Sequence, residues 1–254
     1  MFLDNYHHLK NKEIYVLTLL ILFSIFIRVP VVFLYGDTGL ENEWLILVNN
    51  LTNHGILAFD YHDQNLAKYL FPNLYMPPLY AYYIYFFSTF SLEGQNYILT
   101  ILFSQVLLAS ISVAIFYKIS KIFFSKTISF YSSLLYSLFP LHVYACSQIS
   151  SISLQTFLTI LFFYFFFQFI EKRSFLLVFF VSFIGGLLIL LRQEFVAILA
   201  LSLLYAFIFY KISLKKILLI LLISLITISP YLIRNIIVFE TVTAPQSMPV
   251  RALI

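Results

Sequence analysis

The chain has 254 residues, of which 62% are hydrophobic and only 10% are charged, and its mean hydropathy is +0.96. A water-soluble fold of this length has no interior large enough for so much apolar surface, so the soluble globular class is excluded. The net charge of +4 comes from basic residues in short loops, which excludes a nucleic-acid-binding face. Cys146 is the only cysteine, so no internal disulfide can form.

Several apolar runs reach the roughly 20 residues that a helix needs to cross a bilayer. Short alternating segments of the kind that build membrane barrels do not occur in the sequence. We therefore predict an all-α polytopic membrane bundle with about seven transmembrane helices. The predicted spans are 14–35, 96–117, 127–146, 152–170, 174–191, 195–210 and 216–233.

The first span follows a polar N-terminus and has no cleavage site behind it, so we predict a retained helix rather than a signal peptide. With the N-terminus in the cytoplasm, ten of the 15 basic residues fall in inner segments, as the positive-inside rule requires. The predicted location is the inner or plasma membrane.

The long segment 36–95 is then an outer loop. Leu40, Trp44 and Leu47 follow helical spacing, with Glu41 at the start of the expected helix and Gly55 placed to end it. The run 78–92 is short and rich in tyrosine, which favours a second juxtamembrane helix beginning at the Pro77–Pro78 pair.

The outer loop opens with three acids, Asp37, Glu41 and Glu43. One of them could act as a general base or bind a divalent metal ion, which leaves a metal open as a cofactor. The simpler interpretation is that Asp37 or Glu41 only caps a helix, because the macrodipole favours a carboxylate there.

Further polar residues stand at the expected outer ends of later spans. Arginine suits phosphate because its guanidinium offers a planar fork of donors. The alternative for Arg192 is a self-satisfied pair with Glu194, and the tyrosines could serve only as an interfacial belt. The candidate substrate-binding residues are Arg192, Glu194, Arg234, Asn235, Tyr80 and Gln148.

Five stretches in order resemble the GT-C superfamily of membrane glycosyltransferases, in particular the protein-mannosyltransferase and lipid A aminoarabinose-transferase-like group. They are "LENEWLILVNNLTNHG", "PPLYAYYI", "FPLHVYACSQISS", "LLRQEFV" and "PYLIRNIIVF". Together they cover about residues 14–240. The resemblance implies one seven-span module over 1–254 and a polyprenyl-phosphate sugar donor. It also implies inverting transfer to a lipid, glycan or protein acceptor at the outer face.

The resemblance also implies that an acid near the start of the outer loop is the base. Glu41 matches the second acid of the family's D-E-x-x-Y pattern, whereas Leu40 stands where the first belongs. Asp37 or Glu43 could compensate, and Gln148 could replace an acid that many relatives carry near position 152. Relatives usually continue for several more spans, so a C-terminal part missing from this chain stays open. The alternative is an inactive or truncated module that binds a lipid carrier or a partner protein. A transporter is disfavoured because no paired spans are interrupted mid-membrane.

Overall fold

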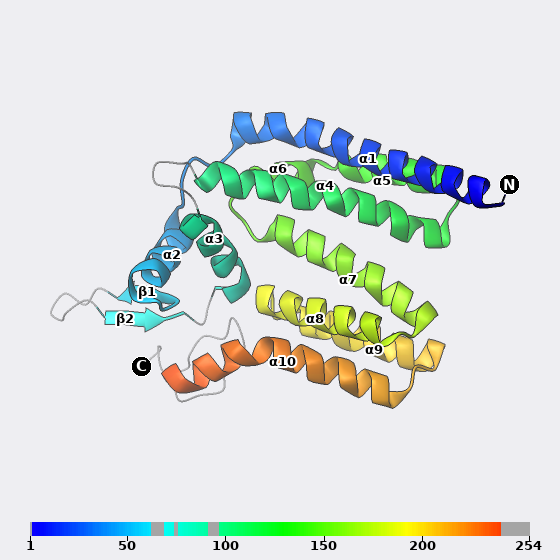
Figure 1. Cartoon of the computed structure of the whole chain (residues 1–254). Coiled ribbons are helices and arrows are strands. Elements are labelled where there is room, and N and C mark those ends of the chain that lie inside the picture. The colour runs from blue at the N-terminus through cyan, green and yellow to red at the C-terminus, as the bar shows by residue number, and fades with distance from the viewer. Residues whose placement is uncertain (1, 62–68, 74–75, 91–96, 240–254) are drawn as a thin grey trace. The chain divides into compact units, whose positions relative to one another are not determined.

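A computed structural model describes the chain except for residues 1, 62–68, 74–75, 91–96 and 240–254 (Figure 1). Side chains of residues 2–12, and of a few others within helices and strands, also lie outside the description. Lys10 and Lys12, which support the predicted cytoplasmic N-terminus, are among them. The described part contains ten helices and two strands, which form two compact units.

The first unit comprises residues 1–38 and 98–164. It holds α1 (Phe2–Tyr35), α4 (Tyr97–Phe123), α5 (Lys126–Ser137), α6 (Pro140–Ala145) and the first part of α7 (Ile152–Lys172). Leu20 of α1 packs with Val113 and Tyr117 of α4 in its core. At the far end of these helices Lys121 forms an ion pair with Glu13 at 2.7 Å.

Two helices replace the single span expected at 127–146. α5 begins after Ser125, whose hydroxyl accepts a hydrogen bond from the Ile128 amide, and it ends at Ser137. Pro140 then opens α6 at a first-turn position, where a proline loses no hydrogen bond. A proline also disfavours helical geometry in the residue before it, so the chain turns at Phe139 and the predicted continuous helix is interrupted.

The second unit comprises residues 39–97 and 165–254. It holds α2 (Asn42–His54), β1 (Ala58–Tyr61), β2 (Tyr69–Pro72), α3 (Pro78–Phe90), the end of α7, α8 (Phe175–Leu191), α9 (Phe195–Tyr210) and α10 (Leu214–Phe239). The strands form an antiparallel ribbon with Ala58 opposite Pro72, which the sequence analysis did not predict. The predicted helices at 41–55 and 78–92 are confirmed, although the end of the second run falls outside the described residues.

α8 and α10 run parallel to each other as the central pair of this unit. The Ser224 hydroxyl donates to the Ser182 carbonyl at 2.9 Å, so the two helix backbones approach closely in mid-span. Gly186 allows this approach, because a Cβ built there would lie 2.6 Å from the Cβ of Thr227. Small residues commonly line such contacts in membranes, where close packing rather than apolar burial joins helices.

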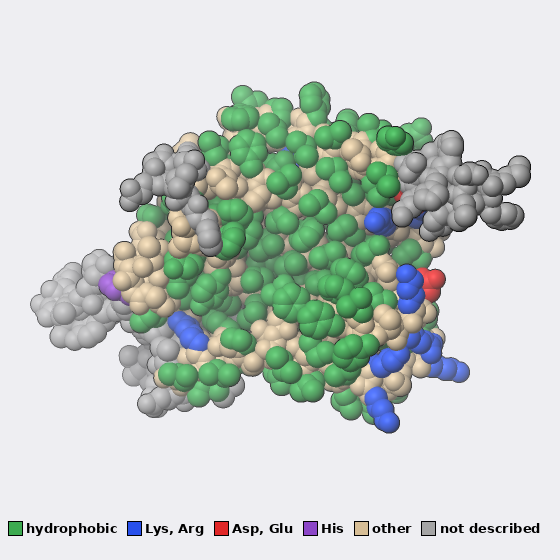
Figure 2. Space-filling view, viewed as in Figure 1, with side chains coloured by type: hydrophobic (Ala, Val, Ile, Leu, Met, Phe, Trp, Pro, Cys, Tyr) green, Lys and Arg blue, Asp and Glu red, His purple; other side chains and the backbone are tan. Residues whose placement is uncertain are grey.

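Four described helices are long and apolar enough to cross a membrane: Glu13–Tyr35, Tyr97–Phe123, Ile152–Lys172 and Leu214–Ile237. Two shorter apolar helices, α8 and α9, coincide with two more of the predicted spans. Large hydrophobic side chains such as Phe26, Leu201 and Phe209 are exposed on these helices, and Figure 2 shows such side chains over most of the visible surface. The all-α membrane bundle is therefore confirmed, while the count of seven spans remains a prediction.

Candidate functional site

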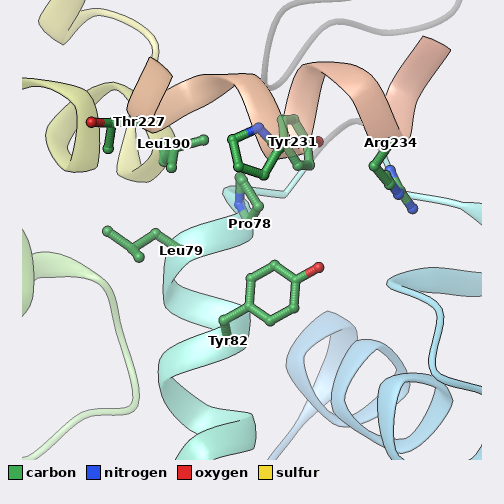
Figure 3. A pocket seen from close by; sticks show the side chains of 8 residues that line it. Pro78, Leu79, Tyr82, Leu190, Thr227, Tyr231 and Arg234 are labelled. Carbon is green, nitrogen blue, oxygen red and sulfur yellow. The ribbon is translucent and has the colours of Figure 1, made fainter. Parts of the chain in front are cut away.

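A pocket of about 280 Å³ opens in the second unit between the start of α3 and the later parts of α8 and α10. Its walls are mostly apolar, and one guanidinium group lies at its edge (Figure 3). Such a lining suits an amphiphilic ligand, whose apolar part and charged part need different surroundings. The lining residues are Pro78, Leu79, Tyr82, Leu190, Thr227, Pro230, Tyr231 and Arg234.

Arg234 joins α10 to the segments on either side of the ribbon. Its Nη2 donates to the Leu57 carbonyl at 2.6 Å, and its Nη1 donates to the Asn73 carbonyl at 3.1 Å. Leu57 precedes β1 and Asn73 follows β2, and the Asn73 amide donates to the Leu57 carbonyl at 2.8 Å. The Tyr231 hydroxyl also reaches the Asn73 carbonyl at 3.4 Å. We call this arrangement of Arg234, Tyr231, Leu57 and Asn73 the ribbon clasp.

Asn235 completes the surroundings of the arginine. Its side-chain oxygen accepts a hydrogen bond from Nη1 of Arg234 at 2.9 Å, and the residue is fully buried. The guanidinium carbon lies 5.8 Å from the centre of the Tyr231 ring, within the range of a cation–π contact. The candidate pair Arg234 and Asn235 is thus brought together, with the arginine both holding the fold and lining the pocket.

Glu41 and Glu43 lie in the same unit as the pocket, at the beginning of α2. Glu41 is the N-cap residue, yet its side chain makes no capping hydrogen bond. Both carboxylates are exposed. Glu41 therefore has the position that the capping interpretation predicts, where the macrodipole favours a carboxylate, but it makes no hydrogen bond to a first-turn amide. An exposed carboxylate without that hydrogen bond is accessible to solvent and to a ligand.

Asp37 lies in the other unit and has a different environment. One of its carboxylate oxygens accepts a hydrogen bond from the Ile149 amide at 2.6 Å, while its own amide donates to the Ser147 carbonyl at 3.0 Å. Gln148 strengthens the same junction, because its Nε2 donates to the Tyr35 carbonyl at 2.8 Å. These bonds fasten the end of α1 to the segment before α7. Asp37 and Gln148, both predicted as site residues, are therefore seen in structural contacts.

Arg192 and Glu194 flank the turn between α8 and α9. Their closest side-chain atoms are 3.4 Å apart, and 44% and 58% of the two side chains is exposed. An exposed pair of this kind contributes at most about 1 kcal/mol to stability. The self-satisfied pair that the sequence left open is therefore present, two residues beyond Leu190 of the pocket wall.

Tyr80 and Tyr82 divide the roles that the sequence assigned to Tyr80 alone. Tyr80 is completely buried, with its ring 4.9 Å from Trp44 and 5.6 Å from Tyr83, so it joins α3 to α2. Tyr82 is exposed and lines the pocket together with Pro78. The spacing of four residues from Pro78 to Tyr82 places both on one helix face, so the pattern in "PPLYAYY" indicates Tyr82 rather than Tyr80 as the neighbour of Pro78.

Arg28 is a buried charge outside the pocket, in the first unit. It lies within α1 and has no exposed surface. Its Nη1 donates to the Ser24 hydroxyl at 2.6 Å and to the Ser137 carbonyl, the last residue of α5, at 3.1 Å. A cation at a helix C-terminus is favourable, so Arg28 stabilises the interruption between α5 and α6.

No group of three or more histidine, cysteine or carboxylate side chains suited to a metal ion occurs among the described residues. The pocket has mostly apolar walls with one arginine at its edge, and it lies in a chain with four helices long and apolar enough to cross a membrane among the described residues. Residues 75–233 match the family model described as dolichyl-phosphate-mannose-protein mannosyltransferase. The match spans more than half of the 254 residues, and the chain belongs to this family. No curated protein matches the chain.

The family consists of membrane glycosyltransferases that use polyprenyl-phosphate sugars, and the resemblance to the GT-C superfamily is thereby confirmed. The chain is an integral membrane protein of this class. Almost the entire pocket lies within the matched residues, and Arg234 is the first residue beyond them. The acids at 37, 41 and 43 precede the matched segment, so their roles rest on the site argument alone.

Proposed function

We propose that the chain transfers a sugar from a polyprenyl-phosphate donor to a lipid, glycan or protein acceptor at the outer face of the membrane. The observation that carries this proposal is the pocket in which Arg234 meets apolar walls from α3, α8 and α10. A polyprenyl phosphate has the matching chemistry, with a long apolar chain joined to an anionic phosphate. Tyr82 and Leu79 would face the first part of the chain, and the guanidinium would face the phosphate.

The reaction is an inverting displacement. The acceptor hydroxyl oxygen forms a bond to the anomeric carbon while the bond from that carbon to the phosphate oxygen breaks. Negative charge grows on the departing phosphate, so a cation near it stabilises the transition state. The proton of the acceptor hydroxyl passes to a carboxylate. Glu41 is our first candidate for this base because it is exposed and makes no capping bond. Asp37 is the second choice of base, and Glu43, exposed two residues after Glu41 in the first turn of α2, is the third.

Arg192, Glu194 and Asn235 have supporting roles in the proposal. Asn235 positions the guanidinium of Arg234 through the 2.9 Å hydrogen bond. Arg192 would be a second contact to the donor phosphate, which would replace Glu194 as the partner of its guanidinium. Tyr80 acts through packing against Trp44, and Gln148 acts by holding the end of α1. If the enzyme uses a divalent cation, Glu41 and Glu43 would hold it, and it would supply positive charge to offset the negative charge of the departing phosphate.

The test is sugar transfer by membranes that contain the protein, with a set of radiolabelled polyprenyl-phosphate sugars as donors. Glu41→Gln combined with Asp37→Asn removes both candidate bases and should lower transfer by roughly 10²–10⁴-fold, the usual contribution of a general base. Glu171→Gln, which removes an exposed carboxylate at the end of α7, is the matched control and should leave transfer unchanged. Full transfer by the double variant would refute the assignment.

A second candidate function is a module that binds the carrier lipid without turnover. Leu40 favours it, because the position of the family's first acid is apolar and only 8% exposed. This candidate predicts saturable binding of polyprenyl phosphate that Arg234→Gln weakens, with no transfer by the purified chain. Any transfer above that of the Glu41→Gln and Asp37→Asn variant rules it out.

A further inference from the structure

Two chain reversals of the second unit lie against each other, far from the pocket. One is the end of α7 with the turn to α8, residues 171–174, and the other is the turn after α9 with the first residues of α10, residues 211–216. Arg173 Nη2 donates to the Tyr210 carbonyl at 2.9 Å, and Lys216 Nζ donates to the Arg173 carbonyl at 2.6 Å. We call these two segments the paired turns. Their mutual hydrogen bonds hold them in a fixed arrangement.

The paired turns carry a concentrated positive charge. They contain five cations and one acid, Glu171, and Figure 2 shows basic side chains gathered where α7 ends and α10 begins. Arg173 and Lys216 make the two hydrogen bonds between the turns, so part of their hydrogen-bonding capacity is taken up by contacts within the protein. The other three cations are exposed and project from the same surface: Lys172, Lys211 and Lys215.

The backbone of the paired turns is unusual at two of these cations. Arg173 has φ 53° and Lys211 has φ 50°, both in the left-handed region. Glycine is the common residue at this position after a helix, because a side chain there costs about 1–2 kcal/mol. Both helix ends thus carry a cation at a position where glycine would be less strained, which adds charge to the surface.

Exposed apolar side chains border the charges directly. Phe175 and Leu176 begin α8, Phe209 precedes Tyr210, and Leu214 begins α10, and each is more than half exposed. This combination of a cationic surface and an apolar margin matches a phospholipid, whose headgroup and chains would meet the two parts in turn. A soluble anion has no apolar part that could contact these exposed hydrophobic side chains.

The position along the helices agrees with a headgroup layer. α8 and α10 run in parallel from the paired turns to the pocket, and the 17 residues of α8 separate the two ends. At 1.5 Å per residue that helix is about 25 Å long, close to the thickness of the hydrocarbon core. We therefore expect the paired turns at the membrane surface opposite the one that holds the pocket.

We propose that the paired turns bind the headgroup of an anionic phospholipid, with its acyl chains against Phe175, Phe209 and Leu214. This interaction goes beyond the proposed sugar transfer and does not depend on it. Basic segments next to membrane helices attract anionic lipids, and each lysine near the surface strengthens the attraction roughly fivefold.

The experiment measures thermal unfolding of the full chain in non-ionic detergent micelles that contain increasing mole fractions of phosphatidylglycerol. The test variant is Lys172→Gln with Lys215→Gln, and the matched control is Lys118→Gln with Lys126→Gln, which removes two charges from the other unit. Phosphatidylglycerol should raise the unfolding temperature of the wild type and the control. The test variant should need a roughly 30-fold higher mole fraction for half of the effect.

Three further arms complete the test. Lys172→Arg with Lys215→Arg keeps both charges and should respond as the wild type does. Phosphatidylcholine and free glycerol 3-phosphate should not raise the unfolding temperature. Equal responses of the test variant and the control would overturn the proposal. So would an equal response to phosphatidylcholine, or full competition by glycerol 3-phosphate.

Discussion

Replacing Gly186 by alanine tests whether the α8–α10 contact is as close as described. A Cβ at this position would lie 2.6 Å from Thr227 Cβ, 2.8 Å from Thr227 Cγ2 and 3.1 Å from the Ser224 carbonyl oxygen. Two of these separations are shorter than carbon atoms tolerate, so α8 and α10 must move apart or bend. Overpacking of this kind costs about 1–3 kcal/mol.

Helix propensity opposes that cost. Exchanging glycine for alanine inside a helix favours the helix by up to about 1 kcal/mol. The net expectation is a destabilisation of about 1–2 kcal/mol, which lowers the unfolding temperature of a chain of this size by roughly 2–8 °C. The assay is thermal unfolding of the purified protein in detergent, followed by tryptophan fluorescence and by circular dichroism.

Two companion variants separate crowding from other causes. Gly39→Ala places a Cβ where no atom lies within 4 Å, and the backbone there is not left-handed, so its unfolding temperature should equal that of the wild type. Thr227→Gly removes both of the closest atoms, so Gly186→Ala should cost less in that background than in the wild type. An unfolding temperature of Gly186→Ala at or above the wild-type value would refute the argument.

Three further predictions use the same unfolding assay. Ser24→Ala removes the oxygen 2.6 Å from the buried Arg28 guanidinium and should cost about 1.5–3 kcal/mol. Ser110→Ala removes a buried hydroxyl that has no hydrogen-bond partner among the described residues and should be neutral or stabilising; the reverse order would contradict the Arg28 contacts. Gly55→Ala imposes a Cβ at φ 70° and should cost about 1–2 kcal/mol, so an unchanged stability would mean that α2 does not end in this conformation. Asp37→Asn retains an acceptor for the Ile149 amide, which Asp37 binds at 2.6 Å, and should unfold near the wild-type temperature. Asp37→Ala removes the acceptor and should lower the free energy of unfolding by about 1–3 kcal/mol. Equal stabilities of the two variants would show that this hydrogen bond contributes nothing.

Local signals allowed much of the second unit to be predicted from the sequence. The spacing of Trp44 and Leu47 predicted the helix α2, and Gly55 predicted its end, which the structure shows in the left-handed conformation. Pro78 predicted the first residue of α3. These features depend on neighbours a few residues away, which periodicity and turn chemistry report directly.

Long-range contacts account for what the sequence analysis missed. Pro140 indicates a helix boundary, but the apolar run around it favoured a single span. The contact that stabilises the interruption joins Ser137 to Arg28, which is 109 residues away in the sequence. Arg234 donates to the backbone carbonyls of Leu57 and Asn73. Every residue has such a carbonyl, so the residue types in the sequence do not indicate which ones accept a hydrogen bond. The acids at the start of the first loop belong to different units, a division that adjacency in sequence concealed.

The ribbon clasp has a consequence for the order in which the protein assembles during synthesis. The bond from Arg234 to the Leu57 carbonyl joins residues that are 177 positions apart. At ~5–20 residues per second, a ribosome needs roughly 10–35 s to travel from one to the other. Once they are synthesised, α2, the ribbon and α3 remain for most of that interval without the helix that fastens them. The first outer loop is thus translated early, but its hydrogen bonds to Arg234 can form only after α10 has been synthesised.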